Sequence, residues 1–322
     1  MKVLITGGSG FIGNRLINLL RDVNELNIVN YDKTQSQDYP EITVIGDVRN
    51  FEELNAACKD VDVIYNLAAE HADNVTPLSL YYDVNVGGAE NVIKAAENNN
   101  IKKIIFTSSV AIYGLNRGTP NEYTDAQPFN EYGRTKLQAE KVFNHWLSKS
   151  DDRTLVTVRP AVVFGENNRG NVYNLITQIA SGRFLMIGDG KNCKSMGYVG
   201  NVAEFLKVQL EKKPGYYVYN YADKDDLSSS EIVSIVRREM NLSSNNFKVP
   251  YFIGLMGGYT FDILSKITGR KFPISAVRIQ KFCAETTIDS SAAMSSGFVP
   301  PYTLEEGLKR MIQHEFNSVQ SR

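Results

Sequence analysis

The sequence has few of the features that indicate a metalloprotein, a disulfide-rich protein or a nucleic-acid-binding protein. It has 3 cysteines and 3 histidines among 322 residues, and none stands at the paired spacing of a zinc site or a disulfide framework. We therefore expect reduced thiols and no metal. The formal net charge is −1, with Lys and Arg scattered along the chain, so no surface for a nucleic acid is expected.

Long apolar runs and internal repeats are also missing. No apolar run reaches the ~18 residues that a membrane-spanning helix needs, and no low-complexity linker interrupts the chain. Because an apolar strand is expected from residue 2 onward, we predict that there is no signal peptide and that the location is cytoplasmic.

What the sequence does contain is an alternation of apolar strands and amphipathic helices. Helical stripes at i, i+3, i+4 and i+7 begin at Ala89 and at Ala139. This alternation predicts an α/β fold with a doubly wound parallel sheet. The predicted strands are 2–6, 26–31, 42–45, 61–67, 103–108, 154–159 and 216–221.

A glycine-rich turn follows the first predicted strand. Gly8, Gly10 and Gly13 satisfy GxGxxG, and Gly7, Gly10 and Gly13 equally satisfy GxxGxxG. Either spacing lets the backbone approach a pyrophosphate at a helix N-terminus. The turn therefore predicts a dinucleotide site, with these candidate residues: Gly7, Gly10, Phe11, Ile12 and Gly13.

Asp32 ends the second predicted strand. It stands close to the ~20-residue offset at which a carboxylate hydrogen-bonds the adenosine ribose. A carboxylate there repels a 2′-phosphate, so NAD is favoured over NADP as the cofactor, although Lys33 lies beside it.

Tyr132 and Lys136 stand four residues apart and should share one face of a helix. A free tyrosine has a pKa near ~10, which the ammonium of Lys136 and a bound nicotinamide cation would lower. Tyr132 is then a candidate general acid or base toward a substrate hydroxyl. Ser108 and Ser109 end a predicted strand, so that a serine hydroxyl can orient the same substrate oxygen.

Together these motifs resemble the extended short-chain dehydrogenases, specifically the NAD-dependent sugar epimerase/dehydratase family. The resemblance spans essentially the whole chain and includes residues 46–48, 67–69, 113–114 and 159–160. It implies a Rossmann-type NAD-binding domain, residues 1–165 with about 198–222, and a smaller substrate-binding lobe, residues 166–197 and 223–322. Family members are commonly homodimers through a four-helix interface, here the helices near 84–98 and 132–148.

The resemblance also implies roles for individual residues. Asp47 and Val48 would flank the adenine, and Leu67, Ala68 and Ala69 would line the cofactor. Lys136 would also hold the nicotinamide ribose. Ser109, rather than Ser108, aligns with the catalytic hydroxyl, which completes the catalytic set: Ser109, Tyr132 and Lys136.

One departure from the family pattern narrows the reaction. Sugar-nucleotide 4,6-dehydratases carry Asp-Glu directly after the catalytic Ser or Thr, where this chain has Val110 and Ala111. Elimination therefore lacks its acid and base. Epimerisation at C4 through a transient ketone remains, and it consumes no cofactor. A net sugar or steroid dehydrogenase would share the same three catalytic residues and stays an alternative.

A further set of segments resembles the bacterial 4-epimerases of this family that act on N-acetylglucosamine linked to undecaprenyl pyrophosphate. These segments are residues 40–42, 69–71, 79–85, 168–174 and 194–201. The implied reaction is GlcNAc to GalNAc on the lipid carrier, for O-antigen or similar surface polysaccharide. UDP-GlcNAc or UDP-glucose stays an alternative substrate.

Candidate substrate contacts follow from the same resemblance. Arg169 and Lys194 could contact the pyrophosphate as charged donors. The small side chain of Thr286 agrees with an N-acetyl sugar. The candidate set is Ser109, Arg169, Asn171, Lys194 and Thr286.

Residues 249–264 are rich in apolar side chains and precede Lys266, Arg270 and Lys271. The segment is too short to span a bilayer but suits an apolar face lying at a membrane surface beside basic residues, over about 249–271. A buried helix of the substrate lobe explains the same pattern equally well.

Overall fold

The structure, a computed structural model, describes residues 1–72, 75–182, 184–243, 247–269 and 275–316. The chain divides into two compact units. The first comprises Met1–Val163, Gly197–Asp223 and Ile288–Tyr302, and the second comprises Phe164–Met196, Lys224–Thr287 and Thr303–Arg322.

The first unit is built on a seven-stranded sheet in the order β11-β6-β5-β4-β1-β2-β3. Every neighbouring pair of strands is parallel. The predicted α/β fold with a doubly wound parallel sheet is confirmed, because all the predicted strands occur with ends shifted by at most two residues. The strands are β1 (Lys2–Thr6), β2 (Asn27–Asp32), β3 (Thr43–Ile45), β4 (Val63–Asn66), β5 (Lys103–Thr107), β6 (Thr154–Pro160) and β11 (Gly215–Tyr221).

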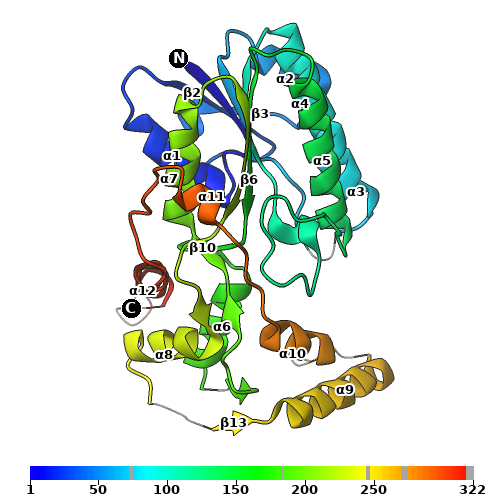
Figure 1. Ribbon diagram of the computed structural model, residues 1–322, viewed down its shortest axis with the longest axis vertical. Coiled ribbons are helices and arrows are strands. Elements are labelled where there is room, and N and C mark those ends of the chain that lie inside the picture. The colour runs from blue at the N-terminus through cyan, green and yellow to red at the C-terminus, as the bar shows by residue number, and fades with distance from the viewer. Residues whose placement is uncertain (73–74, 183, 244–246, 270–274, 317–322) are drawn as a thin grey trace. The chain divides into compact units, whose positions relative to one another are not determined.

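Helices cover both faces of this sheet (Figure 1). On one face, α1 (Phe11–Arg21) and α7 (Val199–Val208) bury Leu16 and Phe205 in a cluster with Ile5 of β1. On the other face, α2 (Phe51–Ala57), α4 (Gly88–Asn98) and α5 (Glu131–Leu147) bury Val92 and Phe143 in a second cluster. Because strand side chains alternate, the central strands β1, β4, β5 and β6 contribute to both clusters. The predicted helical stripes are therefore the core faces of α4 and α5.

Shorter elements join these layers or stand near the unit boundaries. They are η1 (Pro40–Ile42), α3 (Ser79–Tyr82), η2 (Asp83–Gly87), η3 (Val110–Tyr113), β7 (Val162–Phe164), β10 (Met196–Tyr198), η4 (Gln209–Glu211) and α11 (Ser291–Met294). Of these, η2 is a π-helical segment that leads directly into α4. A π-helical turn inside a helix is rare and often marks a functional region.

The second unit consists mainly of helices. Its helices are α6 (Asn171–Ala180), α8 (Ser229–Glu239), α9 (Tyr251–Thr268), α10 (Ala276–Cys283) and α12 (Leu304–Glu315). Short strands pair as β9 (Cys193–Lys194) with β12 (Leu227–Ser228), and as β8 (Met186–Ile187) with β13 (Lys248–Val249). Ser228 and Thr303 begin α8 and α12 with capping boxes, which define where these helices start.

Helix α9 packs against α10 along one narrow face. Gly258 is its buried residue, and a Cβ there would lie 2.8 Å from the backbone of Ala276. The carboxylate of Asp262 accepts a hydrogen bond from Ala276 N at 3.1 Å. Across the described part of the chain, no helix combines the length and the apolarity needed to cross a membrane.

Candidate active site

The three side chains predicted for catalysis come together in the first unit. Tyr132 and Lys136 lie one turn apart near the start of α5, and Ser109 lies after the end of β5. The hydroxyl of Ser109 is a hydrogen-bond partner of the Tyr132 phenol. It also accepts a hydrogen bond from Ala111 N at 3.1 Å, which makes Ser109 the N-cap of η3.

The start of α5 fixes the position of Tyr132. Asn130 caps the helix by accepting a hydrogen bond from Gly133 N at 2.8 Å. Gly133 faces η3, and a Cβ at this position would lie 2.5 Å from the carbonyl oxygen of Ala111. Only glycine therefore lets α5 approach η3 this closely, and this approach brings Tyr132 to Ser109.

Lys136 is buried, with 2% of its surface exposed. Its Nζ lies 4.4 Å from the centroid of the Phe106 ring on β5, within the range of a cation–π contact. Burial disfavours the charged ammonium and lowers the pKa of Lys136 to about 7, while the carboxylate of Glu140 acts in the opposite direction. Lys136 therefore titrates near neutrality in the cofactor-free protein.

In the cofactor-free protein the pKa of Tyr132 is raised, whereas the sequence analysis predicted that it would be lowered. Burial raises the pKa of Tyr132, because the phenolate loses its hydration, and the hydrogen bond from Ser109 offsets this effect only in part. Lys136 is itself desolvated, so its charge does not dominate. A bound nicotinamide cation would add positive charge that acts to lower the pKa of Tyr132.

The glycine turn has the geometry of a nucleotide cradle. Gly7 has φ +74, and a Cβ there would lie 2.6 Å from Ala68 N. A Cβ at Gly13 would lie 2.5 Å from the carbonyl oxygen of Gly7. Gly10 is the N-cap of α1 and has no side chain to satisfy the first amides of the helix, with Phe11 and Ile12 following in its first turn. Those amides are available to an anion.

Asp32 ends β2 beside this turn. Its Oδ2 accepts a hydrogen bond from Ser9 N at 3.0 Å, and its Oδ1 accepts one from Thr34 N at 2.9 Å. These bonds orient the carboxylate and leave acceptor capacity for ribose hydroxyls. The sequence analysis predicted this acid but not its hydrogen bond to the glycine turn.

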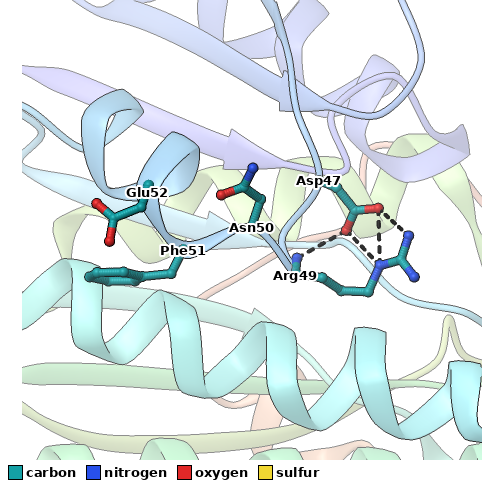
Figure 2. Close-up of a pocket in the computed structure, with 5 residues that line it drawn as sticks. All are labelled: Asp47, Arg49, Asn50, Phe51 and Glu52. Carbon is teal, nitrogen blue, oxygen red and sulfur yellow. Dashed lines mark hydrogen bonds and ion pairs between the residues drawn. The ribbon is translucent and has the colours of Figure 1, made fainter.

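Asp47 and Val48 follow β3 at the same edge of the sheet. Asp47 faces Arg49, and Figure 2 shows the two side chains pointing toward one another. The guanidinium donates to both carboxylate oxygens, with Arg49 Nη2 2.6 Å from Asp47 Oδ2. These bonds hold the pKa of Asp47 below its usual value, although burial opposes them. Asp47 and Arg49 line a pocket of about 480 Å³ together with Asn50, Phe51 and Glu52.

Asn85 is a site residue that the sequence analysis did not single out. It lies buried in η2, accepts from Glu70 N at 2.8 Å, and donates to Glu70 O at 3.0 Å and to Thr135 Oγ1 at 2.9 Å. It thus ties the segment after β4, which contains Leu67, Ala68 and Ala69, to the helix of Tyr132. The sequence signal that could have identified it is an asparagine inside a predicted helix. Burying an asparagine side chain costs free energy unless its amide is hydrogen-bonded.

These features fit a dinucleotide in the first unit. The carboxyl ends of β1 and β4 meet at the point where the strand order reverses, which is where such sheets bind ligands. Two cradle positions have no room for a Cβ. The hydroxyl of Ser108, at the end of β5, is buried without a partner in the described part of the structure. An unsatisfied buried group at this edge agrees with a ligand that completes the site.

The substrate-binding candidates other than Ser109 all belong to the second unit. Thr286 pairs with Lys194 in a β-bridge, so these two are neighbours. Lys194 Nζ donates to Lys281 O at 3.1 Å and to Ala284 O, and thereby caps the end of α10. Burial lowers the pKa of Lys194.

Arg169 and Asn171 lie at the start of α6. Asn171 is the first residue of the helix. Arg169 forms an ion pair with the buried carboxylate of Glu315 at 2.6 Å, and its guanidinium lies 4.3 Å from the centroid of the Tyr173 ring. The sequence analysis predicted a phosphate-binding cation here but could not anticipate that Glu315 orients it.

Comparison with known proteins identifies the class to which this fold and site belong. The family model described as "NAD dependent epimerase/dehydratase family" matches residues 3–222. The chain belongs to this family, with NAD as its cofactor, and is an isomerase of the epimerase type. The predicted family, fold class and cofactor are confirmed.

Individual relatives agree with this assignment. The chain is 53% identical over 317 residues to the N-acetyl-alpha-D-glucosaminyl-diphospho-ditrans,octacis-undecaprenol 4-epimerase of Escherichia coli O157:H7, which covers 98% of this chain and 95% of that protein. It is 25% identical to the UDP-glucose 4-epimerase of Vibrio cholerae, covering 97% and 94%. The fold resembles that of the Thermus thermophilus UDP-glucose 4-epimerase complex with NAD, with a TM-score of 0.75, 19% identity and 98% of both chains covered.

The buried ammonium of Lys136 gives the stability of the cofactor-free protein a defined pH dependence. Below pH 7 both the folded and the unfolded chain hold this proton, so the desolvation cost is fully present. Between about pH 7 and about pH 10 only the unfolded chain holds it, so stability rises with pH, by at most about 1.4 kcal/mol per unit. Lys136→Met should therefore stabilise the protein most at low pH, and its advantage should shrink as the pH rises.

Urea unfolding of the wild type and of Lys136→Met across this pH range measures the effect. Lys141→Met, on the exposed face of the same helix, is the matched control. A difference between wild type and Lys136→Met that stays constant with pH would contradict the assigned lowering of the pKa.

Proposed function

We propose that this protein is an NAD-dependent 4-epimerase that interconverts GlcNAc and GalNAc on undecaprenyl pyrophosphate, for O-antigen or other surface polysaccharide. The observation that carries the proposal is the 53% identity, over 98% of the chain, to a relative named for this lipid-linked sugar. The contact of Ser109 with Tyr132, one turn from Lys136, supports the chemistry.

The catalytic residues have distinct roles in this proposal. The chemistry that NAD supplies when bound is removal of a hydride from C4 of the sugar and its return to the opposite face. Tyr132 accepts the proton of the C4 hydroxyl and later gives it back to the carbonyl oxygen. Ser109 orients that oxygen by a hydrogen bond. Lys136 contributes positive charge beside Tyr132 and holds the nicotinamide ribose.

The positions after Ser109 support epimerisation over elimination. Val110 and Ala111 begin η3 and offer no acid or base to the carbon atoms beside C4. A transient 4-keto sugar therefore has no catalyst for loss of its C6 hydroxyl there. Once the intermediate has turned in the site, returning the hydride gives the epimer.

Cofactor binding falls to the first unit in this proposal. Gly7, Gly10, Phe11, Ile12 and Gly13 surround the pyrophosphate, and Asp32 binds the adenosine ribose. Asp47 and Val48 flank the adenine. The segment formed by Leu67, Ala68 and Ala69 lines the cofactor between its two halves.

In this proposal the second unit binds the sugar and its pyrophosphate carrier. Arg169 and Asn171 at the start of α6 meet the pyrophosphate, with Arg169 held by Glu315. Lys194 adds positive charge, and the neighbouring Thr286 leaves room for the acetamido group. We assign residues 166–197 and 223–322 to the substrate-binding lobe, although Ile288–Tyr302 belong to the first compact unit.

We also propose that α9 lies on the cytoplasmic surface of a membrane, where the substrate is held by its lipid. Its exposed face carries a stripe of apolar side chains at spacings of three and four residues, which are Phe252, Met256, Tyr259, Ile263 and Ile267. These residues are 52% to 75% exposed. A helix of 18 residues is about 27 Å long. Lys266 lies within the helix as an exposed cation, whereas Arg270 and Lys271 lie outside the described residues.

A homodimer through α4 and α5 is the third proposal. The exposed faces of these helices carry charges of both signs, Glu90 and Lys94 on α4, and Arg134 and Lys141 on α5. Where α4 of one copy meets α5 of its partner about a two-fold axis, Glu90 can pair with a cation of α5.

The substrate is tested with purified protein, NAD and detergent, incubated separately with undecaprenyl-pyrophosphate GlcNAc and with UDP-GlcNAc, followed by hydrolysis and identification of the sugars. We expect GalNAc from the lipid-linked sugar and none with Tyr132→Phe, which should still bind NAD. GalNAc from the nucleotide sugar alone would make the protein a sugar-nucleotide epimerase. Steady accumulation of NADH would indicate a net dehydrogenase.

Membrane binding is tested by sedimentation with vesicles that contain anionic phospholipid. Phe252→Ser combined with Met256→Ser should lower vesicle affinity roughly tenfold or more, because two apolar side chains lose their burial in lipid. Tyr123→Ser combined with Val299→Ser, two exposed positions of the first unit, is the matched control. Unchanged binding of the α9 variant, or an equal loss in the control, would contradict the assignment.

The dimer is tested by light scattering of the detergent-free protein. We expect twice the mass of the chain, and weaker association for Glu90→Lys, which places like charges on both helices. A single-chain mass for the wild type at micromolar concentration would rule out a stable dimer.

A further inference from the structure

Arg159 stands at the end of β6, next to last in the strand, and is 8% exposed. Its guanidinium donates in two directions. Nε and Nη2 donate to the carboxylate of Glu140 at 2.9 and 2.7 Å. Nη1 donates to the Tyr113 hydroxyl at 2.7 Å and to the carbonyl oxygen of Glu122 at 3.2 Å.

Each of the two main partners belongs to an element that carries a catalytic candidate. Glu140 lies on α5, one turn beyond Lys136 and two turns beyond Tyr132, and is buried. Tyr113 is the last residue of η3, the turn that Ser109 caps. One side chain from β6 therefore joins the helix of Tyr132 to the turn of Ser109.

The Tyr113 end of this network is fixed in turn. The hydroxyl of Tyr113 donates to Asn220 Oδ1 on β11 at 2.7 Å. Asn220 Nδ2 donates to Pro120 O and to Asp289 O, both at 3.2 Å. The hydroxyl that Arg159 contacts therefore cannot shift without breaking several buried hydrogen bonds.

Stability alone is a weak reason to bury such an ion pair. Removing two charges from water costs free energy that their attraction often fails to recover, and apolar residues of equal size can stabilise a core as well. A forked, planar donor does offer fixed geometry, because its hydrogen bonds set both distance and direction. The short approach of Gly133 to Ala111 shows that the spacing of α5 and η3 is narrowly defined.

We infer that Arg159 is a positioning residue, which holds α5 through Glu140 and η3 through Tyr113 so that Ser109 and Tyr132 stay in hydrogen-bonding register. This inference rests on the proposed roles of Ser109 and Tyr132. The network also affects charge in the site, since Glu140 opposes the lowering of the Lys136 pKa by burial. Among the described residues, Glu140 on α5 is the charged group that acts on Lys136, and Arg159 on β6 is hydrogen-bonded to Glu140.

Two variants test the inference. Tyr113→Phe removes one hydroxyl and keeps the ion pair, and Arg159→Lys keeps the charge and loses the fork. Both should lower kcat by about tenfold or more, because the reacting groups are displaced, with the KM for the lipid-linked sugar and the Kd for NAD nearly unchanged. The pKa of Tyr132 in the NAD complex should rise by roughly one unit. Ultraviolet titration of tyrosinate, as the difference between each protein and its Tyr132→Phe counterpart, measures that pKa.

Arg153 provides the matched control. It immediately precedes β6, donates to Trp146 O near the end of α5, and lies 4.7 Å from the Trp146 ring centroid. Arg153→Gln therefore loosens the same helix at the end remote from Tyr132. It should lower the melting temperature and leave both kcat and the Tyr132 titration as in the wild type.

Each outcome decides the question. If Tyr113→Phe folds, binds NAD and keeps the wild-type kcat and Tyr132 titration, the inference is wrong, even if Arg159→Lys fails to fold. A change in KM alone, or an equal loss in Arg153→Gln, would also overturn it. The tyrosinate titration and NAD binding need no sugar, so failure of the proposed substrate is distinguishable from failure of this inference.

Discussion

Parallel pairing of seven strands is the constraint on which the site of this protein depends. When every strand runs in the same direction, all the carboxyl ends reach the same edge of the sheet. The glycine turn follows β1, Asp32 ends β2, Asp47 follows β3 and Ser109 follows β5. Residues separated by a hundred positions in the chain are thereby collected at one edge, and the helices between the strands bury enough apolar surface to hold that edge in place.

The same constraint explains what could be read from the sequence. Strands with apolar cores and helices with apolar stripes are local patterns, so the sheet and its layers could be predicted almost residue by residue. The glycine turn and the pair formed by Tyr132 and Lys136 are also local, because their spacing is set within one turn or one helix. Family resemblance then supplied the roles of Asp47 and Ala68, which spacing alone does not assign.

What could not be predicted depends on contacts between distant segments. Glu315, which orients Arg169, lies 146 positions further along the chain, and no sequence pattern near either residue predicts their contact. Lys194 looked like a free cation but binds carbonyl groups at the end of α10. The pKa of Tyr132 was expected to fall, yet burial outweighs its neighbours in the cofactor-free protein. The magnitude of desolvation follows from how densely the chain packs around a group, which a spacing pattern does not contain.

The hydrogen bond from Ser9 N to the Asp32 carboxylate has a consequence for the fate of the cofactor. This bond ties the glycine turn to the end of β2, which reduces the ordering that NAD binding has to impose on the turn. Preorganisation of this kind favours slow release. In the proposed epimerisation the hydride returns to the sugar in every turnover, so the oxidised cofactor need not be exchanged for the reduced one. Slow release of NAD would then be an advantage, whereas in a dehydrogenase it would limit the rate.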